Sequence, residues 1–100
     1  MYVVYILFLD ISNKYYIGST ENLELRIKHH NYGATPSTKS GAPNWKVVYS
    51  EKAADKPAAR KREREIKKKK SRKYIEFLIR LIIFRNHIRI MREYRYIYNS

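Results

Sequence analysis

Apolar runs and polar turns alternate along the first half of the chain, which is typical of short strands. Residues 2–9 (YVVYILFL) are β-branched or aromatic at odd and even positions alike, and this predicts a strand buried on both faces. Residues 10–13 have turn chemistry, and residues 14–19 (KYYIGS) predict a second strand, so the two form a hairpin. Residues 45–50 (WKVVYS) predict a third strand.

A first helix is expected directly after the hairpin. Either Thr20 or Asn22 is placed to cap it, and it should run to about Asn31 and end at Gly33. Residues 32–44 (YGATPSTKSGAPN) are rich in Gly, Pro, Ser and Thr, which predicts a polar loop before the third strand.

Two further helices are expected after the third strand. One begins near Asp55 and Pro57 and runs to about Lys70, and the other covers residue 72 to roughly residue 84. The resulting order, ββαβα(α), predicts an α+β domain in which helices cover a small antiparallel sheet.

The last segment, residues 85–100, fits two interpretations equally well. Its residues Arg85, Arg89 and Arg92 recur four and three positions apart, as on one face of an amphipathic helix. The same residues are also compatible with a frayed basic tail.

Composition favours one folded domain over a disordered or membrane-spanning chain. Apolar residues make up 44% of the 100 residues, and the absence of cysteine excludes disulfides and thiolate metal sites. Residues 1–9 lack a basic leader segment and are followed at once by Asp10, so we interpret them as a strand and not as a signal peptide. The apolar run 77–84 is interrupted by Arg80 and is too short to cross a bilayer. We therefore expect a cytoplasmic protein.

Net charge gives the first indication of a partner. The chain has 22 Lys and Arg against 9 Asp and Glu, a net charge of +13 and a pI near 10.1. Such a positive field favours a polyanion, and nucleic acid is the commonest one. Residues 56–73 hold eleven basic and two acidic residues, and Ile66 is the only large apolar residue in 60–73. A lipid-surface helix needs a broad apolar face, so we expect nucleic acid and no membrane.

The first predicted helix carries two unusual side chains on its apolar face. Leu23, Arg26, Ile27 and His30 lie at i, i+3, i+4 and i+7, which places them on one side of the helix. An inward arginine is suited to binding a phosphate through two hydrogen bonds. The alternatives are an arginine that snorkels at the edge of the core and a histidine that is only structural.

The basic helix has one acidic residue on its least polar side. Ala59, Glu63 and Ile66 are spaced i, i+4 and i+7, so the Glu63 carboxylate is predicted to face inward. An inward carboxylate requires a cation, which is either Arg26 or a divalent metal ion. A buried Glu–Arg pair without chemistry is the competing interpretation.

Tyrosines on the hairpin add a candidate acid or base. Tyr5 lies in the first strand and Tyr15 and Tyr16 in the second, so Tyr5 and one of the other two can share a face of the sheet. A phenol near a metal ion and an arginine loses its proton more easily and can act as a base toward water. Aromatic packing in the core is the alternative.

In order and spacing, these residues resemble the GIY-YIG nucleases, in particular the short single-domain type related to the nuclease domain of the bacterial excision-repair incision protein. Val3-Val4-Tyr5 corresponds to the first signature element, with Val3 in place of glycine, and Tyr16-Ile17-Gly18 is the intact second one. Arg26 lies ten residues after Tyr16, as in the family, and His30 follows four residues later. The resemblance covers roughly residues 1–80, and residues 81–100 match no family pattern, so we expect a nuclease domain over 1–80 and a C-terminal basic extension over 81–100.

The resemblance implies a fold and a reaction. The fold is a GIY-YIG-like α/β (α+β) domain with a three-stranded antiparallel sheet flanked by helices. The activity is an endonuclease that hydrolyses phosphodiester bonds with one Mg²⁺ or Mn²⁺, with DNA as the expected substrate and DNA repair as the expected setting. Tyr16, deprotonated or with its proton relayed through His30, would activate water. Glu63 would hold the metal ion, Arg26 would stabilise the phosphoryl charge and Tyr5 would orient water or phosphate. Ser19 stands where some members carry a lysine beside the site.

The basic run is the expected nucleic-acid contact. Its density and its lack of groups suited to base edges predict binding to backbone phosphates. The residues are Lys67, Lys68, Lys69, Lys70, Arg72 and Lys73. Two rivals stay open: a non-catalytic nucleic-acid-binding module of the same fold, and a basic RNA-associated protein with stacking tyrosines on the sheet.

Overall fold

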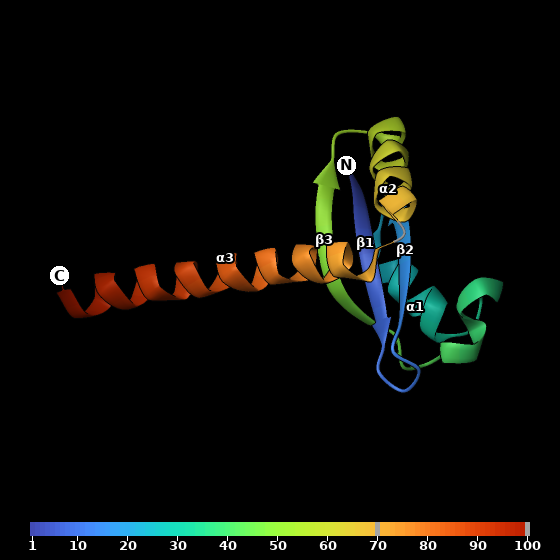
Figure 1. Ribbon diagram of the computed structural model, residues 1–100, viewed down its shortest axis with the longest axis horizontal. Coiled ribbons are helices and arrows are strands. Elements are labelled where there is room, and N and C mark those ends of the chain that lie inside the picture. The colour runs from blue at the N-terminus through green and yellow to red at the C-terminus, as the bar shows by residue number, and fades with distance from the viewer. Residues whose placement is uncertain (70, 100) are drawn as a thin grey trace. The chain divides into compact units, whose positions relative to one another are not determined.

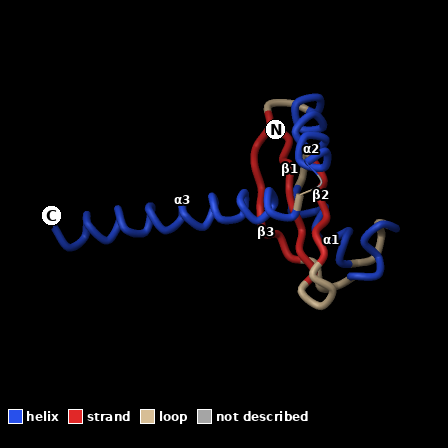
Figure 2. Tube along the Cα trace, viewed as in Figure 1, coloured by secondary structure: helices blue, strands red, loops and turns tan. Residues whose placement is uncertain are grey.

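A computed structural model of the chain describes the backbone of residues 1–69 and 71–99, with all side chains there except those of residue 37 and residues 87–99. The chain forms two compact units, Met1–Lys70 and Ser71–Ser100. Figures 1 and 2 show the sheet and helices of the first unit.

The first unit is built on a three-stranded antiparallel sheet. Its strands are β1 (Tyr2–Leu9), β2 (Lys14–Thr20) and β3 (Lys46–Ala53), in the order β2-β1-β3. The predicted α+β fold with a three-stranded antiparallel sheet is thus confirmed. Strand β3 continues three residues beyond the predicted end at residue 50, because its pairing with β1 extends as far as Ala53 opposite Tyr2.

Helix α1 (Leu23–Asn31) follows the hairpin as predicted. Of the two candidate caps, Asn22 is the one used, since its side-chain oxygen accepts a hydrogen bond of 3.1 Å from the backbone N–H of Leu25. Beyond the helix, Gly33 has a φ of 77°, a left-handed conformation that glycine adopts without strain. The following segment was predicted to be an irregular loop but contains a 3₁₀ helix, η1 (Pro36–Gly41).

Helix α2 (Lys56–Lys69) begins after Asp55, whose carboxylate accepts a hydrogen bond from the backbone N–H of Ala58 at 2.9 Å. It packs against all three strands and buries Ala59 and Ile66, the two apolar residues of the predicted inward face. An ion pair between Arg62 and Glu51 joins the helix to β3.

Alternation along β1 divides the core between the two faces of the sheet. Tyr5, Leu7 and Leu9 are buried on one face together with Trp45, and the apolar side of α1 packs against this cluster. Val4 and Ile6 alternate with these residues and are also fully buried, as the both-sided apolar pattern predicts. Ser19 pairs with Val4 in the sheet and hydrogen-bonds to α2, so α2 covers this second face.

The second unit consists of one helix, α3 (Arg72–Asn99). It is capped by Ser71, whose hydroxyl accepts a hydrogen bond of 3.2 Å from the N–H of Tyr74. The backbone of α3 is helical without a break at residue 80, so residues 85–99 are part of the helix. The side chains of Arg89 and Arg92 lie outside the described residues. The division into a domain over 1–80 and an extension over 81–100 stays a prediction. Within the described part of the chain, no helix combines the length and apolarity needed to cross a bilayer.

Candidate active site

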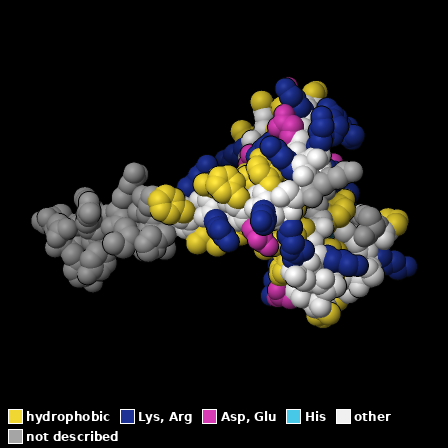
Figure 3. All heavy atoms as spheres, viewed as in Figure 1, with side chains coloured by type: hydrophobic (Ala, Val, Ile, Leu, Met, Phe, Trp, Pro, Cys, Tyr) yellow, Lys and Arg dark blue, Asp and Glu magenta, His cyan; other side chains and the backbone are white. Residues whose placement is uncertain are grey.

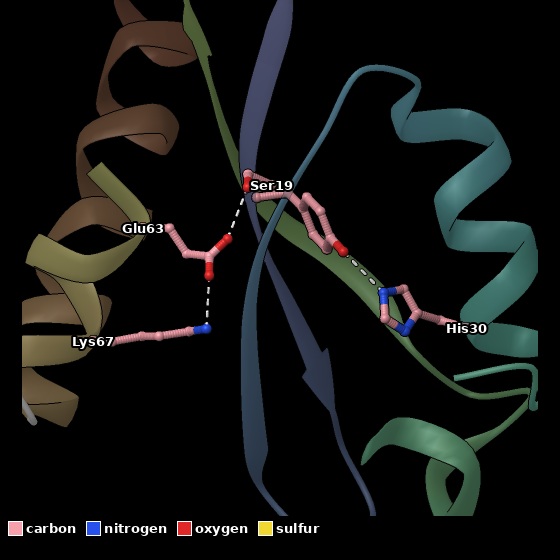
Figure 4. A network of polar contacts seen from close by, with 5 residues as sticks. Ser19, His30, Glu63 and Lys67 are labelled. Carbon is pink, nitrogen blue, oxygen red and sulfur yellow. Dashed lines mark hydrogen bonds and ion pairs between the residues drawn. The ribbon is translucent and has the colours of Figure 1, made fainter. Parts of the chain in front are cut away.

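A buried series of hydrogen bonds links three elements on the α1 face of the sheet. The Tyr5 hydroxyl of β1 lies 2.9 Å from Nε2 of His30 in α1. Nδ1 of the same histidine lies 2.7 Å from Oγ1 of Thr38 in η1. All three residues are 0% exposed. Figure 4 shows His30 reaching from α1 toward the strands. These groups therefore interact with one another and not with bulk water.

Gly18 makes room for the Tyr5 hydroxyl. The two residues are opposite one another in the β1–β2 register. A Cβ atom added at Gly18 would lie 2.5 Å from the Tyr5 hydroxyl oxygen and 3.1 Å from a ring carbon of Tyr16. The glycine of the second signature element is needed here for space, because any side chain would displace the phenol.

Tyr16 shares this face and Tyr15 does not. The Tyr16 ring lies edge-on to His30 with 4.9 Å between ring centroids, whereas Tyr15 contacts Phe8, also at 4.9 Å. Tyr16 is partly exposed, in contrast to the fully buried Tyr5. The expectation that Tyr5 and one of the two β2 tyrosines share a face is met by Tyr16.

Arg26 brings a positive charge to the same place. Its Nε atom is buried and has no hydrogen-bond partner among the described residues. Hydrogen bonding with the Tyr5 hydroxyl raises the pKa of Arg26, and a further interaction with Tyr16 acts in the same direction. A guanidinium with an unused inward donor beside two phenols is suited to binding an oxyanion.

Burial sets the protonation of the two groups that could exchange a proton. It raises the pKa of the Tyr5 phenol, against the opposing influence of Arg26. It lowers the pKa of His30, and the positive charge of Arg26 adds to this effect. The imidazole is therefore neutral near pH 7, with one protonated and one unprotonated nitrogen. We call Tyr5, Tyr16, Arg26, His30 and Thr38 the tyrosine–histidine cluster.

A second group of polar residues lies on the α2 face. One carboxylate oxygen of Glu63 accepts a hydrogen bond of 2.8 Å from the Ser19 hydroxyl, and the other accepts one of 2.8 Å from the Lys67 ammonium (Figure 4). The Glu63 side chain is 22% exposed and that of Lys67 is 50% exposed. We call these three residues the carboxylate cluster.

Glu63 stays ionised in this setting. Burial favours the neutral acid, but the hydrogen bonds from Lys67 and Ser19 outweigh it and lower the pKa of the carboxyl group. Its partner differs from the prediction in one respect. Arg26 was a candidate counter-ion for Glu63, but the cation paired with Glu63 is Lys67. Lys67 lies one helical turn after Glu63 on α2, whereas Arg26 lies with Tyr5 on the other face of the sheet.

The two clusters lie on opposite sides of strand β2. Gly18 and Ser19 are consecutive residues of β2, so they point to opposite faces of the sheet. Gly18 lies against Tyr5, and Ser19 binds Glu63. Figure 4 shows Glu63 and Lys67 on one side of the strands and His30 on the other. The structure thus places all five predicted catalytic residues around one edge strand, but in two groups. The hydrogen bond of His30, which was expected to relay a proton for Tyr16, goes to Tyr5.

The predicted phosphate contacts are divided between elements. Lys67, Lys68 and Lys69 belong to α2, and Lys and Arg side chains gather over this helix in Figure 3. Lys67 forms an internal ion pair with Glu63, and the predicted phosphate contact would have to share its ammonium. Lys70 lies outside the described residues. Arg72 and Lys73 begin α3, where Arg72 pairs with Glu76 at 3.6 Å.

Two site residues escaped the sequence-based reasoning. Thr38 lies in a segment that was predicted to be an irregular loop, where no periodicity marks an inward hydroxyl. Ser19 was considered only as the position where some family members carry a lysine. Strand alternation also predicts that its side chain points to the face of the sheet opposite to that of Gly18. Among the described residues no group of three or more His, Cys, Asp or Glu side chains comes together, so Glu63 is the carboxylate on which a metal ion would depend.

Comparison with known proteins gives one match. A family profile described as the GIY-YIG catalytic domain matches residues 1–75, three quarters of the chain. No curated protein matches, and no solved structure does.

Proposed function

Because the chain belongs to the GIY-YIG catalytic domain family, whose members are generally nucleases, we propose that it is a metal-dependent endonuclease that hydrolyses phosphodiester bonds in nucleic acid, DNA first. One observation carries the proposal. An ionised, half-buried Glu63 carboxylate and an arginine with an unused buried donor flank the same strand in a chain of net charge +13. In a protein that only bound nucleic acid, this carboxylate would oppose binding, since it repels phosphate.

The carboxylate cluster fits a divalent metal ion. Glu63 is ionised and already holds a cation, the Lys67 ammonium, on its more open side. That ammonium ends a flexible, half-exposed side chain, which can move aside. Mg²⁺ and Mn²⁺ prefer carboxylate oxygen, and Mg²⁺ commonly keeps several waters in such sites. A single carboxylate therefore suits an ion that binds firmly only together with substrate phosphate.

In the proposed reaction the ion held by Glu63 would supply positive charge to the scissile phosphate and the leaving oxygen. Tyr16 is the proposed base toward the attacking water, since it is the more accessible of the two tyrosines on its face. The water oxygen forms a new bond to phosphorus, and the bond from phosphorus to the leaving oxygen breaks.

Arg26 and Tyr5 act on the phosphoryl group in this scheme. The free Nε donor of Arg26 offers a hydrogen bond to a phosphate oxygen, and its charge opposes the negative charge that accumulates during attack. Tyr5 is fully buried beside Arg26, so its contribution is to keep the guanidinium in place and not to contact bulk water.

The burial of the tyrosines also bears on the RNA-stacking alternative. A sheet that stacks bases needs exposed aromatic rings. Tyr5 is 0% exposed, and Tyr16 lies under α1 against His30 and Trp45. These two tyrosines are better placed for chemistry with a phosphate than for stacking.

The test is a comparison of two glutamate variants. Glu63→Gln removes the charge with little change in volume, and Glu65→Gln, at a 50% exposed carboxylate on the same helix, is its matched control. Both are incubated with labelled linear and branched DNA and RNA in Mg²⁺, in Mn²⁺ and in EDTA. We expect cleavage by the natural protein and by Glu65→Gln, no cleavage in EDTA, and binding without cleavage by Glu63→Gln. Normal cleavage by Glu63→Gln would show that the metal assignment is wrong. Binding without cleavage by every protein would identify a non-catalytic module.

A further inference from the structure

We infer that Thr38 is a positioning residue: its hydroxyl holds neutral His30 as the tautomer protonated on Nδ1, so that Nε2 accepts the Tyr5 proton and the Tyr5 oxygen stays an acceptor beside the Arg26 guanidinium. The catalytic meaning of this arrangement rests on the proposed function. The tautomer itself does not, and it can be measured directly.

The hydrogen bonds around Thr38 give the direction of each proton. Its Oγ1 lies 2.7 Å from His30 Nδ1 and 3.4 Å from the backbone carbonyl of Thr35. A carbonyl only accepts hydrogen bonds, so the single hydroxyl proton of Thr38 points to Thr35. The hydroxyl oxygen is then the acceptor, and Nδ1 of His30 must carry the proton.

The Tyr5 end of this series of hydrogen bonds requires the same arrangement. Arg26 has five N–H donors and no acceptor, so the Tyr5 proton cannot point toward the guanidinium. Among the described residues, the hydrogen-bond partner of the phenol is Nε2 of His30, at 2.9 Å. If Nε2 carried the proton, the Tyr5 oxygen would accept it, and the phenol proton would be left in a buried site without this acceptor. The Thr38 end and the Tyr5 end therefore select the same tautomer independently.

The position of Thr38 is well supported by the fold. It lies within η1, where its backbone N–H donates to the Thr35 carbonyl at 3.1 Å. Its own carbonyl accepts a hydrogen bond of 2.8 Å from the indole N–H of Trp45. Trp45 in turn is part of the core cluster on this face of the sheet. A segment tied down in this way holds a hydroxyl in place, unlike an irregular loop.

This orientation matters for a phosphate because it sets the direction of Arg26. With the reverse tautomer, the Tyr5 oxygen would accept from His30 and its proton would be driven toward the guanidinium. The guanidinium would then face a donor and be repelled from it. One buried threonine, acting through His30 and Tyr5, would thus control where the positive charge points.

The direct experiment is a long-range ¹H–¹⁵N correlation spectrum of the full chain labelled with ¹⁵N-histidine, with His30 assigned by its loss in His30→Gln. Four proteins are compared at pH 7.5: the natural chain, Thr38→Val, Thr38→Ser and Thr35→Val. Thr35→Val is the matched control, since it removes a hydroxyl from the same segment and keeps the Thr35 carbonyl. We expect the Nδ1–H tautomer in the natural chain, Thr38→Ser and Thr35→Val. In Thr38→Val, the preference should fall by about tenfold, the size of effect expected from losing one buried hydrogen bond.

Cleavage assays on the same proteins separate this inference from the proposed function. Thr38→Val should lower kcat and Thr38→Ser should restore it, while Thr35→Val should leave it unchanged. An Nε2–H tautomer in the natural chain would overturn the inference, as would a Thr38→Val spectrum identical to the natural one. If Thr38→Val does not fold, the natural chain and Thr38→Ser still decide the tautomer. Expected tautomers without cleavage by any protein would leave the inference standing and remove the proposed function.

Discussion

Three members of the tyrosine–histidine cluster are closed to water, whereas the carboxylate cluster on the other side of β2 is partly open to it. In the first, Tyr5, His30 and Thr38 are 0% exposed, and burial keeps the histidine neutral. In the second, Glu63 is 22% exposed and Lys67 is 50% exposed, and hydrogen bonds keep the carboxylate ionised. The two sides differ in burial although a single residue step along the strand separates them.

The difference suits two physical tasks. Directing a proton between neutral groups needs fixed donors and acceptors, and water would compete for each of them. Binding a hydrated divalent ion needs a charge that remains accessible, because Mg²⁺ gives up its waters reluctantly. A single edge strand can serve both because its alternation sends consecutive residues, Gly18 and Ser19, into the two environments. The predictions below alter one side at a time.

The largest effect is expected from Tyr16→Phe, which removes the proposed base from the tyrosine–histidine cluster. The loss of a general base typically lowers a rate by about 10²–10⁴-fold, and phenylalanine keeps the packing against His30. Tyr15→Phe is the matched control, because that ring lies against Phe8 on the other face. Single-turnover cleavage with saturating Mg²⁺ measures both. A Tyr16→Phe rate within a few-fold of the natural rate would transfer the role of base to Tyr5 or His30.

Gly18→Ala should disturb the same cluster by crowding. The added methyl group would meet the Tyr5 hydroxyl, and overpacking of this kind costs about 1–3 kcal/mol. Thermal unfolding followed by circular dichroism measures this cost. We also expect a lower cleavage rate in the folded variant, because Tyr5 must move.

Gly33→Ala provides the comparison for that loss of stability. Gly33 has a φ of 77°, so alanine is strained there by about 1–2 kcal/mol. The nearest atom to its added methyl group is the Lys39 Cγ at 3.5 Å, an ordinary contact. Gly33→Ala should therefore lower the unfolding temperature and leave the cleavage rate of the folded protein unchanged. Equal rate losses in both variants would mean that stability, and not the position of Tyr5, explains the Gly18 result.

On the carboxylate side, Lys67→Met should strengthen metal binding. The ammonium occupies a Glu63 oxygen at 2.8 Å, and a metal ion must displace it. A half-exposed pair of this kind contributes up to about 1 kcal/mol, so we expect Mn²⁺ to bind about two- to fivefold more tightly without the lysine. Titration of Mn²⁺ followed by electron paramagnetic resonance measures the affinity, and Lys68→Met is the control of equal charge. An unchanged or weaker affinity in Lys67→Met would show that the lysine does not compete with the ion.

The smallest effect is expected from the outer side of α2. Replacing Lys68 and Lys69 by Ala should make the log–log dependence of binding on salt shallower by about 0.7–0.9 for each phosphate that the variant no longer neutralises. Affinity should fall similarly for two unrelated sequences, and chemistry on saturating substrate should change little. Lys14 and Lys52, which are also exposed but lie on β2 and β3, provide a double variant with the same change in charge. Equal slopes for the natural chain and the Lys68/Lys69 variant would mean that the binding surface lies elsewhere.

Sequence alone determined the three strands, the three α-helices and most members of the two clusters. The inward positions of His30 and of the Ala59/Glu63/Ile66 face follow from helical periodicity, which is a local property. The pairing of Tyr5 with the second signature element follows from hairpin geometry. The Lys67–Glu63 pair also follows from the sequence, because it obeys the i, i+4 rule on a helix.

Only the tertiary structure decided which groups meet across the sheet. Local rules say which side of a helix is apolar, but they do not say which face of a sheet that helix covers. The separation of Glu63 from Arg26 therefore appeared only when α1 and α2 were seen to pack on opposite faces. Thr38 reaches His30 because Trp45 ties η1 to the core, a contact between segments without any repeating pattern. Periodicity reports the burial of a residue within its own element, whereas the partner of a buried polar group depends on how separate elements pack.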